Sequence, residues 1–195
     1  MELEYKFQLN SRADGERVIA ALRGRGVIEG GPRRYNMNSR YYDADGILSA
    51  AGYTLRLRRE NSTSVCCLKC NTREADGARL REEYECEAGD IAEGIRGLGK
   101  IGAPPEFMAL VASLRLEVCG QVMFTREAYT AAYGGARLEI CLDEGVGATG
   151  PFGELEMEYK SGDVGEFMEF AREAQGEYGL VVESRSKAQW ARGSI

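Results

Sequence analysis

The sequence predicts an α+β domain built on an antiparallel β-barrel or β-sandwich with flanking helices. Eight or nine segments have the character of strands, most of them follow one another in hairpin order, and only a few segments show helical periodicity. The 195 residues contain no internal repeat, low-complexity tract or clear linker. We therefore expect one domain over residues 1–195.

The N-terminal half begins with a strand over residues 2–9, where charged or polar and apolar residues alternate. An amphipathic helix is predicted over 14–25, and glycines between Gly24 and Pro32 are expected to break the chain. An extended segment over 33–43 and a short helical turn over 46–51 follow. Further strands are predicted over 53–60, 64–71 and 78–87, with turns at Asn61-Ser62 and Asp76-Gly77.

The C-terminal half begins with two helical pieces over residues 90–112, broken near Gly102 to Pro105. Strands then return in hairpin order, separated by glycine-containing turns. A helix over 163–175 follows, with Phe167 and Phe170 on its apolar stripe. The predicted strands are 114–119, 121–130, 136–143 and 152–160, and the tail holds Val181-Val182 and a short helix over 186–192.

Composition excludes several kinds of chemistry. The chain has no histidine, so Ser-His-Asp or Cys-His catalysis and histidine metal ligation are impossible. Any metal must bind carboxylates, carbonyls or thiolates. The net charge is −6, which argues against a nucleic-acid partner but permits a local basic cavity.

The N-terminus and the cysteines favour a cytoplasmic protein without a membrane segment. Glu2, Glu4 and Lys6 occupy the place of a signal-peptide apolar region, and no window approaches 18 apolar residues. Cys67 and Cys70 form a single CxxC without a second pair, in a predicted strand where positions three apart face opposite sides. We therefore expect buried, reduced thiols rather than a zinc or redox site.

Charge on the predicted strands is unusual. Glu154, Glu156 and Glu158 share one face of one strand, although glutamate is depleted in strands. Glu2 and Glu4 are arranged in the same way on the first strand, whereas Arg56 and Arg58 form a basic face on another. Most charged strand faces are simply solvated. Across six strands, however, the separation of sign by strand favours a barrel with an acidic and a basic inner wall, which suits divalent metal and a polyphosphate.

Several motifs together resemble the CYTH, or triphosphate tunnel metalloenzyme, superfamily. Glu2-Leu3-Glu4-Tyr5-Lys6 matches its ExExK signature near the amino terminus. The further matching segments follow in order along nearly the whole chain: Tyr41-Tyr42-Asp43, Gly52 to Arg59, Leu68-Lys69, Arg81-Glu82-Glu83, Arg126, Leu142 to Gly145, Glu154 to Glu158, and Ser186-Lys187.

The resemblance implies an eight-stranded antiparallel β-barrel, a triphosphate tunnel with flanking helices, that uses Mg²⁺ or Mn²⁺. Metal ligands are expected among Glu2, Glu4, Glu154, Glu156 and Glu158. Expected triphosphate-binding residues are Lys6, Arg56, Arg58, Lys69, Arg81, Arg126 and Lys187. Glu4, Lys6, Glu156 and Arg58 are expected to act in catalysis, and Glu83, Glu139 and Asp143 to support the two groups.

The implied activity is metal-dependent hydrolysis of a small triphosphate-containing substrate, with inorganic triphosphate as the leading candidate. An adenylate cyclase or a thiamine triphosphatase of the same family is the nearest alternative. A non-catalytic binder of polyphosphate or nucleotide is the alternative of a different class, although such a protein would gain nothing from Glu154, Glu156 and Glu158 in its cavity. Barrels of this kind can pair through their outer surfaces, so a homodimer stays open.

Overall fold

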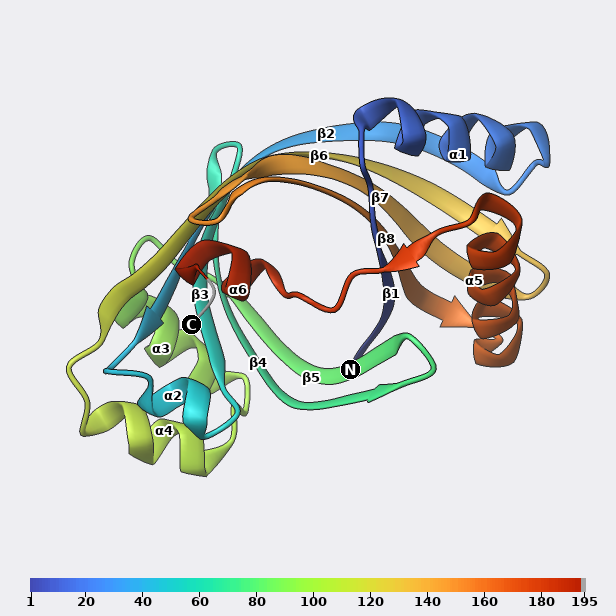
Figure 1. Ribbon diagram of the computed structural model, residues 1–195. Helices are drawn as coiled ribbons and strands as arrows, with labels where there is room; N and C mark the ends of the chain where they lie inside the picture. The colour runs from blue at the N-terminus through green and yellow to red at the C-terminus, as the bar shows by residue number, and fades with distance from the viewer. Residues whose placement is uncertain (194–195) are drawn as a thin grey trace.

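A computed structural model describes residues 1–193 (Figure 1). The strands are β1 (Glu2–Gln8), β2 (Ile28–Asp43), β3 (Thr54–Glu60), β4 (Thr63–Ala75), β5 (Ala78–Glu87), β6 (Glu117–Tyr133), β7 (Ala136–Gly147), β8 (Gly150–Gly162) and β9 (Val181–Val182). The helices are α1 (Arg12–Gly24), α2 (Ile47–Ala50), α3 (Ile91–Lys100), α4 (Pro105–Ala112), α5 (Val164–Tyr178) and α6 (Lys187–Arg192). No helix among these residues is long and apolar enough to cross a membrane.

Eight strands close into an antiparallel barrel, which confirms the predicted fold class. The strand order is β5-β4-β3-β2-β6-β7-β8-β1, and β1 pairs with β5 to complete the ring. The short β9 extends the free edge of β1 at Phe7 and Gln8, beyond the residues that pair with β5. Closure gives every barrel strand a partner on both sides and leaves one enclosed face.

Two predicted breaks are wrong, because glycine lies inside a strand in both places. The predicted strands 114–119 and 121–130 are replaced by the single strand β6, which begins at Glu117, and Gly120 lies opposite Tyr41 where the β2–β6 register shifts. A Cβ on Gly120 would lie 2.7 Å from the carbonyl oxygen of Ala191, so this glycine allows a helix to approach. Likewise β2 begins at Ile28 rather than at residue 33, with register shifts around Gly30 that a bulged strand tolerates.

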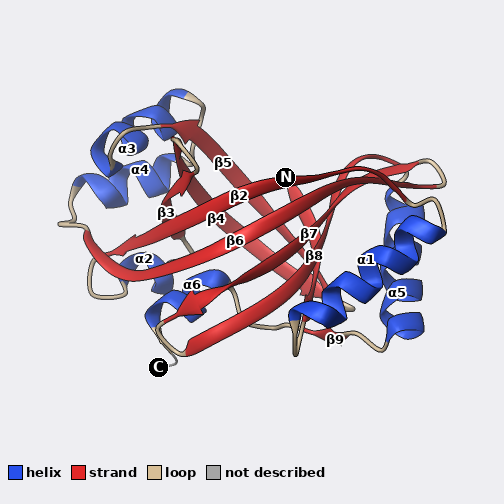
Figure 2. Cartoon of the chain, turned by 90° about the horizontal axis from the view of Figure 1, so that it is seen from above, coloured by secondary structure: helices blue, strands red, loops and turns tan. Residues whose placement is uncertain are grey.

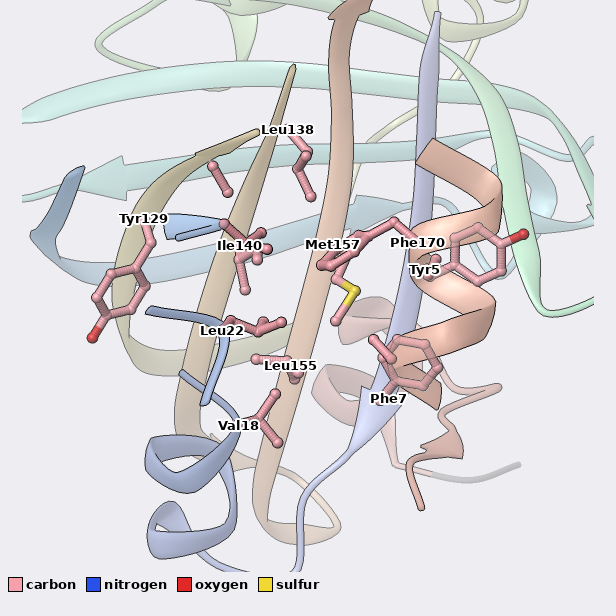
Figure 3. Close-up of a cluster of buried hydrophobic side chains, with 14 of the residues drawn as sticks. Tyr5, Phe7, Val18, Leu22, Tyr129, Leu138, Ile140, Leu155, Met157 and Phe170 are labelled. Atoms are coloured by element: carbon pink, nitrogen blue, oxygen red, sulfur yellow. The ribbon is translucent and has the colours of Figure 1, made fainter. Parts of the chain in front are cut away.

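The outer faces of the barrel carry the apolar side chains, as alternation predicts. Tyr5, Phe7, Leu155 and Met157 point outward into a core that α1 and α5 cover (Figure 3). On the opposite side, α2, α3 and α4 cover a second apolar cluster over β3 and β4 that includes Leu68. Figure 2 shows these two groups of helices at opposite ends of the barrel. The enclosed face is thereby left to the charged residues.

One end of the barrel interior is apolar, which the alternation argument did not predict. Phe124 and Phe152 point inward there and pack with Trp190 of α6; the rings of Phe152 and Trp190 stack with centroids 5.4 Å apart. The backbone of α6 approaches closely, since a Cβ on Gly147 would lie 2.4 Å from the Trp190 carbonyl oxygen. Helix α6 thus lies across this end of the barrel, next to the turn between β7 and β8.

Truncation of a side chain under α5 should test this packing. Phe167 is fully buried against the rings of Tyr5 and Tyr159. We expect Phe167→Ala to lower the free energy of unfolding by about 3–5 kcal/mol, because it removes apolar contacts and leaves a cavity. Val164→Ala, at a position that is 43% exposed on the same helix, should change it by about 0.5 kcal/mol or less. Urea titration checks both; a loss below about 1 kcal/mol for Phe167→Ala would contradict the packing.

Candidate functional site

On the inner wall, charged residues of neighbouring strands lie side by side in register. Glu4 of β1 lies opposite Glu158 of β8, and Glu158 lies opposite Glu139 of β7. One layer further along, Lys6 lies opposite Glu156. Because side chains alternate along a strand, these residues all point to the side away from the outer apolar core. The pairing therefore brings the predicted acidic strands side by side.

The inner wall encloses a cavity of about 240 Å³. Eight basic and seven acidic side chains line it, so its own charges nearly cancel. The predicted residues that line it are Glu2, Lys6, Arg56, Arg58, Lys69, Arg81, Arg126, Glu156, Glu158 and Lys187. Glu4 and Glu154 are buried in the wall instead, Glu4 against Arg81 and Glu154 against Lys187. The structure thus gathers all of the predicted site residues in and around one cavity.

The basic residues of β4 and β5 hold the first acidic residues of β1. The Lys69 ammonium donates to both carboxylate oxygens of Glu2 at 3.0 Å. Arg81 bridges Glu2 and Glu4, with Nη2 donating to Glu4 Oε1 at 2.8 Å. Burial alone would raise the pKa of Glu2, but Lys69 and Arg81 outweigh it and hold that pKa well below its ordinary value.

Two arginines of β3 retain unused donors. Arg56 and Arg58 each lie 3.5 Å from a Glu85 oxygen, and Arg58 also pairs with Glu60. The Nε–H groups of both arginines are buried without a hydrogen-bond partner among the described residues. A buried donor without a partner is costly, and a guanidinium matches the oxygens of a phosphate group. The two guanidinium groups therefore have donors that an anion in the cavity could accept.

At the opposite wall, Lys187 of α6 reaches into a group of three carboxylates. Its Nζ lies 2.7 Å from Asp143 Oδ2, 2.5 Å from Glu154 Oε2 and 2.7 Å from Glu156 Oε1. Burial disfavours the ammonium, but the three carboxylates outweigh it and raise the pKa of Lys187 well above its ordinary value. Lys187 therefore stays charged and ties α6 to β7 and β8.

The same carboxylates also contact two other bases. Arg126 donates to Asp143 Oδ1 at 2.7 Å and also pairs with Glu156, and Lys6 lies 3.4 Å from Glu156. Against the effect of burial, Lys187, Arg126 and Lys6 lower the pKa of Glu156 well below its ordinary value. Glu158 is different, because burial and the charges of Glu2 and Glu156 raise its pKa despite the partner Lys160.

The carboxylates around Lys187 form an oxygen donor set of the kind that a divalent cation takes, and the Lys187 ammonium lies among them. Oxygens of Asp143, Glu154 and Glu156 lie within 4.8 Å of one another. Glu154 is fully buried, and its Oε1 has no hydrogen-bond partner among the described residues. An all-oxygen donor set suits Mg²⁺ or Mn²⁺. The five predicted metal ligands are nevertheless divided, with Glu2 and Glu4 held by Lys69 and Arg81 and with Glu154 and Glu156 held by Lys187.

The separation of sign by strand is less complete than the sequence suggested. Glu83 and Glu85 stand among the basic residues of β3 to β5, and Lys160 follows Glu158 on the acidic strand β8. The reason is physical, since a closed low-dielectric cavity disfavours unpaired charge on either wall. Lys160 lies two positions after Glu158 on the same face of β8, so the alternation of side chains along the strand could have identified it as an inward-facing residue. Arg33, the first residue of the predicted extended segment 33–43, pairs with Glu139, a contact between distant segments that the sequence pattern did not indicate.

The cysteines divide as the strand parity predicts. Cys67 lines the cavity, where its thiol donates to Glu83 Oε1 at 3.1 Å, and Cys70 is buried outside it, against the second cavity described below. Burial raises the pKa of the Cys67 thiol, so it stays protonated. All six cysteines are free, and Cys66, Cys67, Cys70 and Cys141 are buried.

The depressed pKa values predict acid sensitivity of the ligand-free protein. Glu2 and Glu156 have pKa values below the ordinary 4.5 in the folded state, so their stabilisation is complete above that pH and is lost as the pH falls. We expect Glu2→Gln to make the decline of unfolding free energy below pH 4.5 shallower, by up to about 1.4 kcal/mol per pH unit. Urea titrations from pH 3 to 7 in EDTA check this.

Glu158→Gln provides a control of opposite sign. Because the pKa of Glu158 is raised, its ionisation costs stability as the pH rises through that value. The difference in unfolding free energy between Glu158→Gln and the wild type should therefore shift in favour of the variant between pH 4 and pH 7. An unchanged acid limb in Glu2→Gln would contradict the ion pairing described for Glu2.

Comparisons with known proteins agree with this architecture. The family model described as CYTH domain matches residues 1–189. An inorganic triphosphatase from Haemophilus influenzae is 28% identical over 163 residues, which cover 78% of this chain and 44% of that protein. The chain thus spans less than half the length of this curated relative.

Solved structures show the same fold. A protein from Hippeastrum, described as a "putative adenylyl cyclase" with a dominant triphosphatase activity, superposes with a TM-score of 0.68 at 22% identity, covering 100% of this chain and 97% of that one. A Pyrococcus horikoshii protein superposes with a TM-score of 0.62 at 19% identity, covering 98% and 99% of the two chains. With a family match over residues 1–189 and the closed barrel that the motifs predict, the chain belongs to the CYTH domain family.

Proposed function

We propose that this protein is a metal-dependent triphosphatase that hydrolyses inorganic triphosphate to pyrophosphate and phosphate. The observation that carries the proposal is the small enclosed cavity lined by eight bases and seven acids. The Nε–H groups of its buried Arg56 and Arg58 have no partners among the described residues, as expected for a site that receives an anion. The likeness to an inorganic triphosphatase from Haemophilus influenzae supports the same activity.

The balance of charge supports a metal requirement. The basic side chains of the cavity exceed the acidic ones by one, eight against seven, whereas an ionised triphosphate carries several negative charges. Enclosing such an anion without further cations would leave uncompensated charge in a poorly solvated space. Divalent cations on the carboxylates would supply the missing charge. Mg²⁺ and Mn²⁺ both suit these oxygen ligands.

The residues divide into two roles. The metal would be held by carboxylates from among Glu2, Glu4, Glu154, Glu156 and Glu158, with Asp143 added by the structure. When bound, it would neutralise phosphate oxygens and polarise the phosphorus–oxygen bonds. The phosphates would be bound by Lys6, Arg56, Arg58, Lys69, Arg81, Arg126 and Lys187.

Catalysis would depend on fixed positive charge around the transferred phosphoryl group. Arg58 and Lys6 come from β3 and β1, so they can approach the substrate from different walls. Their charges would oppose the negative charge that spreads over the phosphoryl oxygens in the transition state. Lys187 keeps its proton, so it acts through its charge rather than as a proton donor. A carboxylate such as Glu156 would orient the attacking water.

An organic triphosphate is the second candidate substrate. A further cavity of about 450 Å³ adjoins the charged one and shares Thr54, Thr72, Ser186 and Ala188 with it. Apart from Arg192, its lining residues are uncharged, and they include Tyr53 and Asn71. A neutral group attached to a triphosphate could occupy this space. That observation keeps adenylate cyclase and thiamine triphosphatase activities as alternatives.

Product analysis tests the proposal. We expect purified protein with Mg²⁺ or Mn²⁺ to release phosphate and pyrophosphate from inorganic triphosphate. EDTA should abolish this release, because removal of the divalent cation leaves the negative charge of the substrate uncompensated. ATP and thiamine triphosphate are offered separately, and cyclic AMP is scored. Cyclic AMP from ATP would replace the hydrolase with a cyclase. Tight triphosphate binding without any product would establish a non-catalytic binder instead.

The carboxylate of Glu4 is the sharpest single-residue test. Glu4→Gln should lower kcat by about 100-fold or more while the fold is retained, because an amide is a poor ligand for Mg²⁺. Glu127→Gln is the matched control, since Glu127 is also a strand glutamate paired with an arginine, Arg34, but it faces the outside of the barrel. Circular dichroism checks the fold and phosphate release checks the rate. Wild-type turnover in Glu4→Gln would contradict the metal assignment.

A further inference from the structure

The segment that carries Lys187 into the cavity is a short extended connection. Residues 183–186, here called the strap, run from β9 to the first turn of α6 across the barrel (Figure 1). The Glu183 N–H donates to the carbonyl of Lys6 at 2.9 Å, and Ser186 caps α6 together with Gln189. Helix α6 has six residues, too few to be stable by itself. Its position must therefore be set by contacts at its ends and along its length.

Arg79 of β5 holds the strap from the barrel wall. Its Nη2 donates to the carbonyl oxygen of Ser184 at 2.9 Å, three residues before Lys187. Its Nε donates to Glu74 Oε1 at 2.7 Å. Among residues 1–193, no other side chain of the barrel strands hydrogen-bonds to the strap. Arg79 is thus the side-chain link between β5 and the segment that delivers Lys187.

The same guanidinium also faces the acidic wall. Arg79 lies directly opposite Glu4 in the β1–β5 pair and is only 9% exposed. Its Nη1 lies 3.8 Å from Glu4 Oε1 and has no hydrogen-bond partner among the described residues. A planar guanidinium directs its donors in fixed directions, so one side chain can hold two groups in a set relation. Arg79 therefore joins the Glu4 side of the cavity to the strap.

We propose that Arg79 is a positioning residue that sets the place of Lys187 in the cavity by holding the strap at Ser184. The inference rests on the proposed function, because it assigns Lys187 a part in triphosphate turnover. At its other end α6 is held by Arg192, whose Nη2 lies 3.4 Å from Asp43 Oδ2. Loss of the Arg79 anchor leaves the Glu183 N–H bond to the Lys6 carbonyl to link the strap to the barrel, while Lys187 keeps its ion pairs with the carboxylates of β7 and β8.

The single tryptophan of the chain reports on this anchor without any assay of activity. Trp190 lies in α6, stacks on Phe152, and is covered by the Arg185 guanidinium 3.8 Å from its ring centroid. We expect Arg79→Gln to increase acrylamide quenching of Trp190 by about twofold, because a displaced strap uncovers the ring. Glu74→Gln is the control: it removes the outer partner of Arg79 but leaves the Ser184 contact, so quenching should not change.

Kinetics test whether Arg79 acts through Lys187. Arg79→Gln should lower kcat for triphosphate by about 10- to 100-fold, since a displacement near 1 Å at a charged group costs that much. In a Lys187→Gln background, the same change should cost less than about twofold. Arg79→Lys keeps the positive charge but lacks the planar guanidinium with its several fixed donors, so it should give an intermediate kcat. This variant keeps the test usable if Arg79→Gln folds poorly.

The outcomes separate this inference from the proposed function. Additive losses in the double variant, or unchanged Trp190 quenching in both Arg79 variants, would overturn the positioning role. If wild-type protein hydrolyses no triphosphate, the proposed function fails, and altered quenching in Arg79→Gln would still establish the anchor. Non-additive kinetics together with altered quenching would support the positioning of Lys187.

Discussion

Compensation of buried charge inside a closed barrel is the constraint on which this structure depends. Closure turns one face of eight strands toward the interior, which holds a cavity of about 240 Å³ where ions are poorly solvated. Carboxylates that enter are therefore met by bases, as Glu2 is met by Lys69 and Arg81 of two other strands. The pairings shift the pKa values and draw α6 toward the inner wall.

The same need for charge compensation makes the cavity suitable for binding a metal ion and a polyanion together. Among residues 1–193, the ion pairs of the cavity leave the Nε–H groups of Arg56 and Arg58 and one oxygen of Glu154 without a hydrogen-bond partner. A metal and a polyanion arriving together could satisfy these atoms while preserving overall neutrality. Replacing a buried ion pair by another set of ion pairs costs less than exposing either charge alone.

Helix α6 completes the interior at its apolar end. Trp190 packs on Phe152, the backbone approaches Gly120 and Gly147, and Lys187 extends from the first turn into the carboxylates. One short helix thereby supplies both the apolar closure and one of the cations of the site. The two glycines are required because the helix backbone lies where a Cβ would be.

Much of the barrel and its inner charges could be predicted from the sequence, because side-chain alternation is a local property of a strand. Parity alone placed Glu2, Glu4 and Lys6 on one face, and the ordered motifs indicated their family. The register between strands, the continuity of β6 through Gly120 and the capture of Lys187 by Asp143, Glu154 and Glu156 depended on tertiary structure. These features arise from contacts between segments far apart in the chain, whose geometry no local pattern encodes.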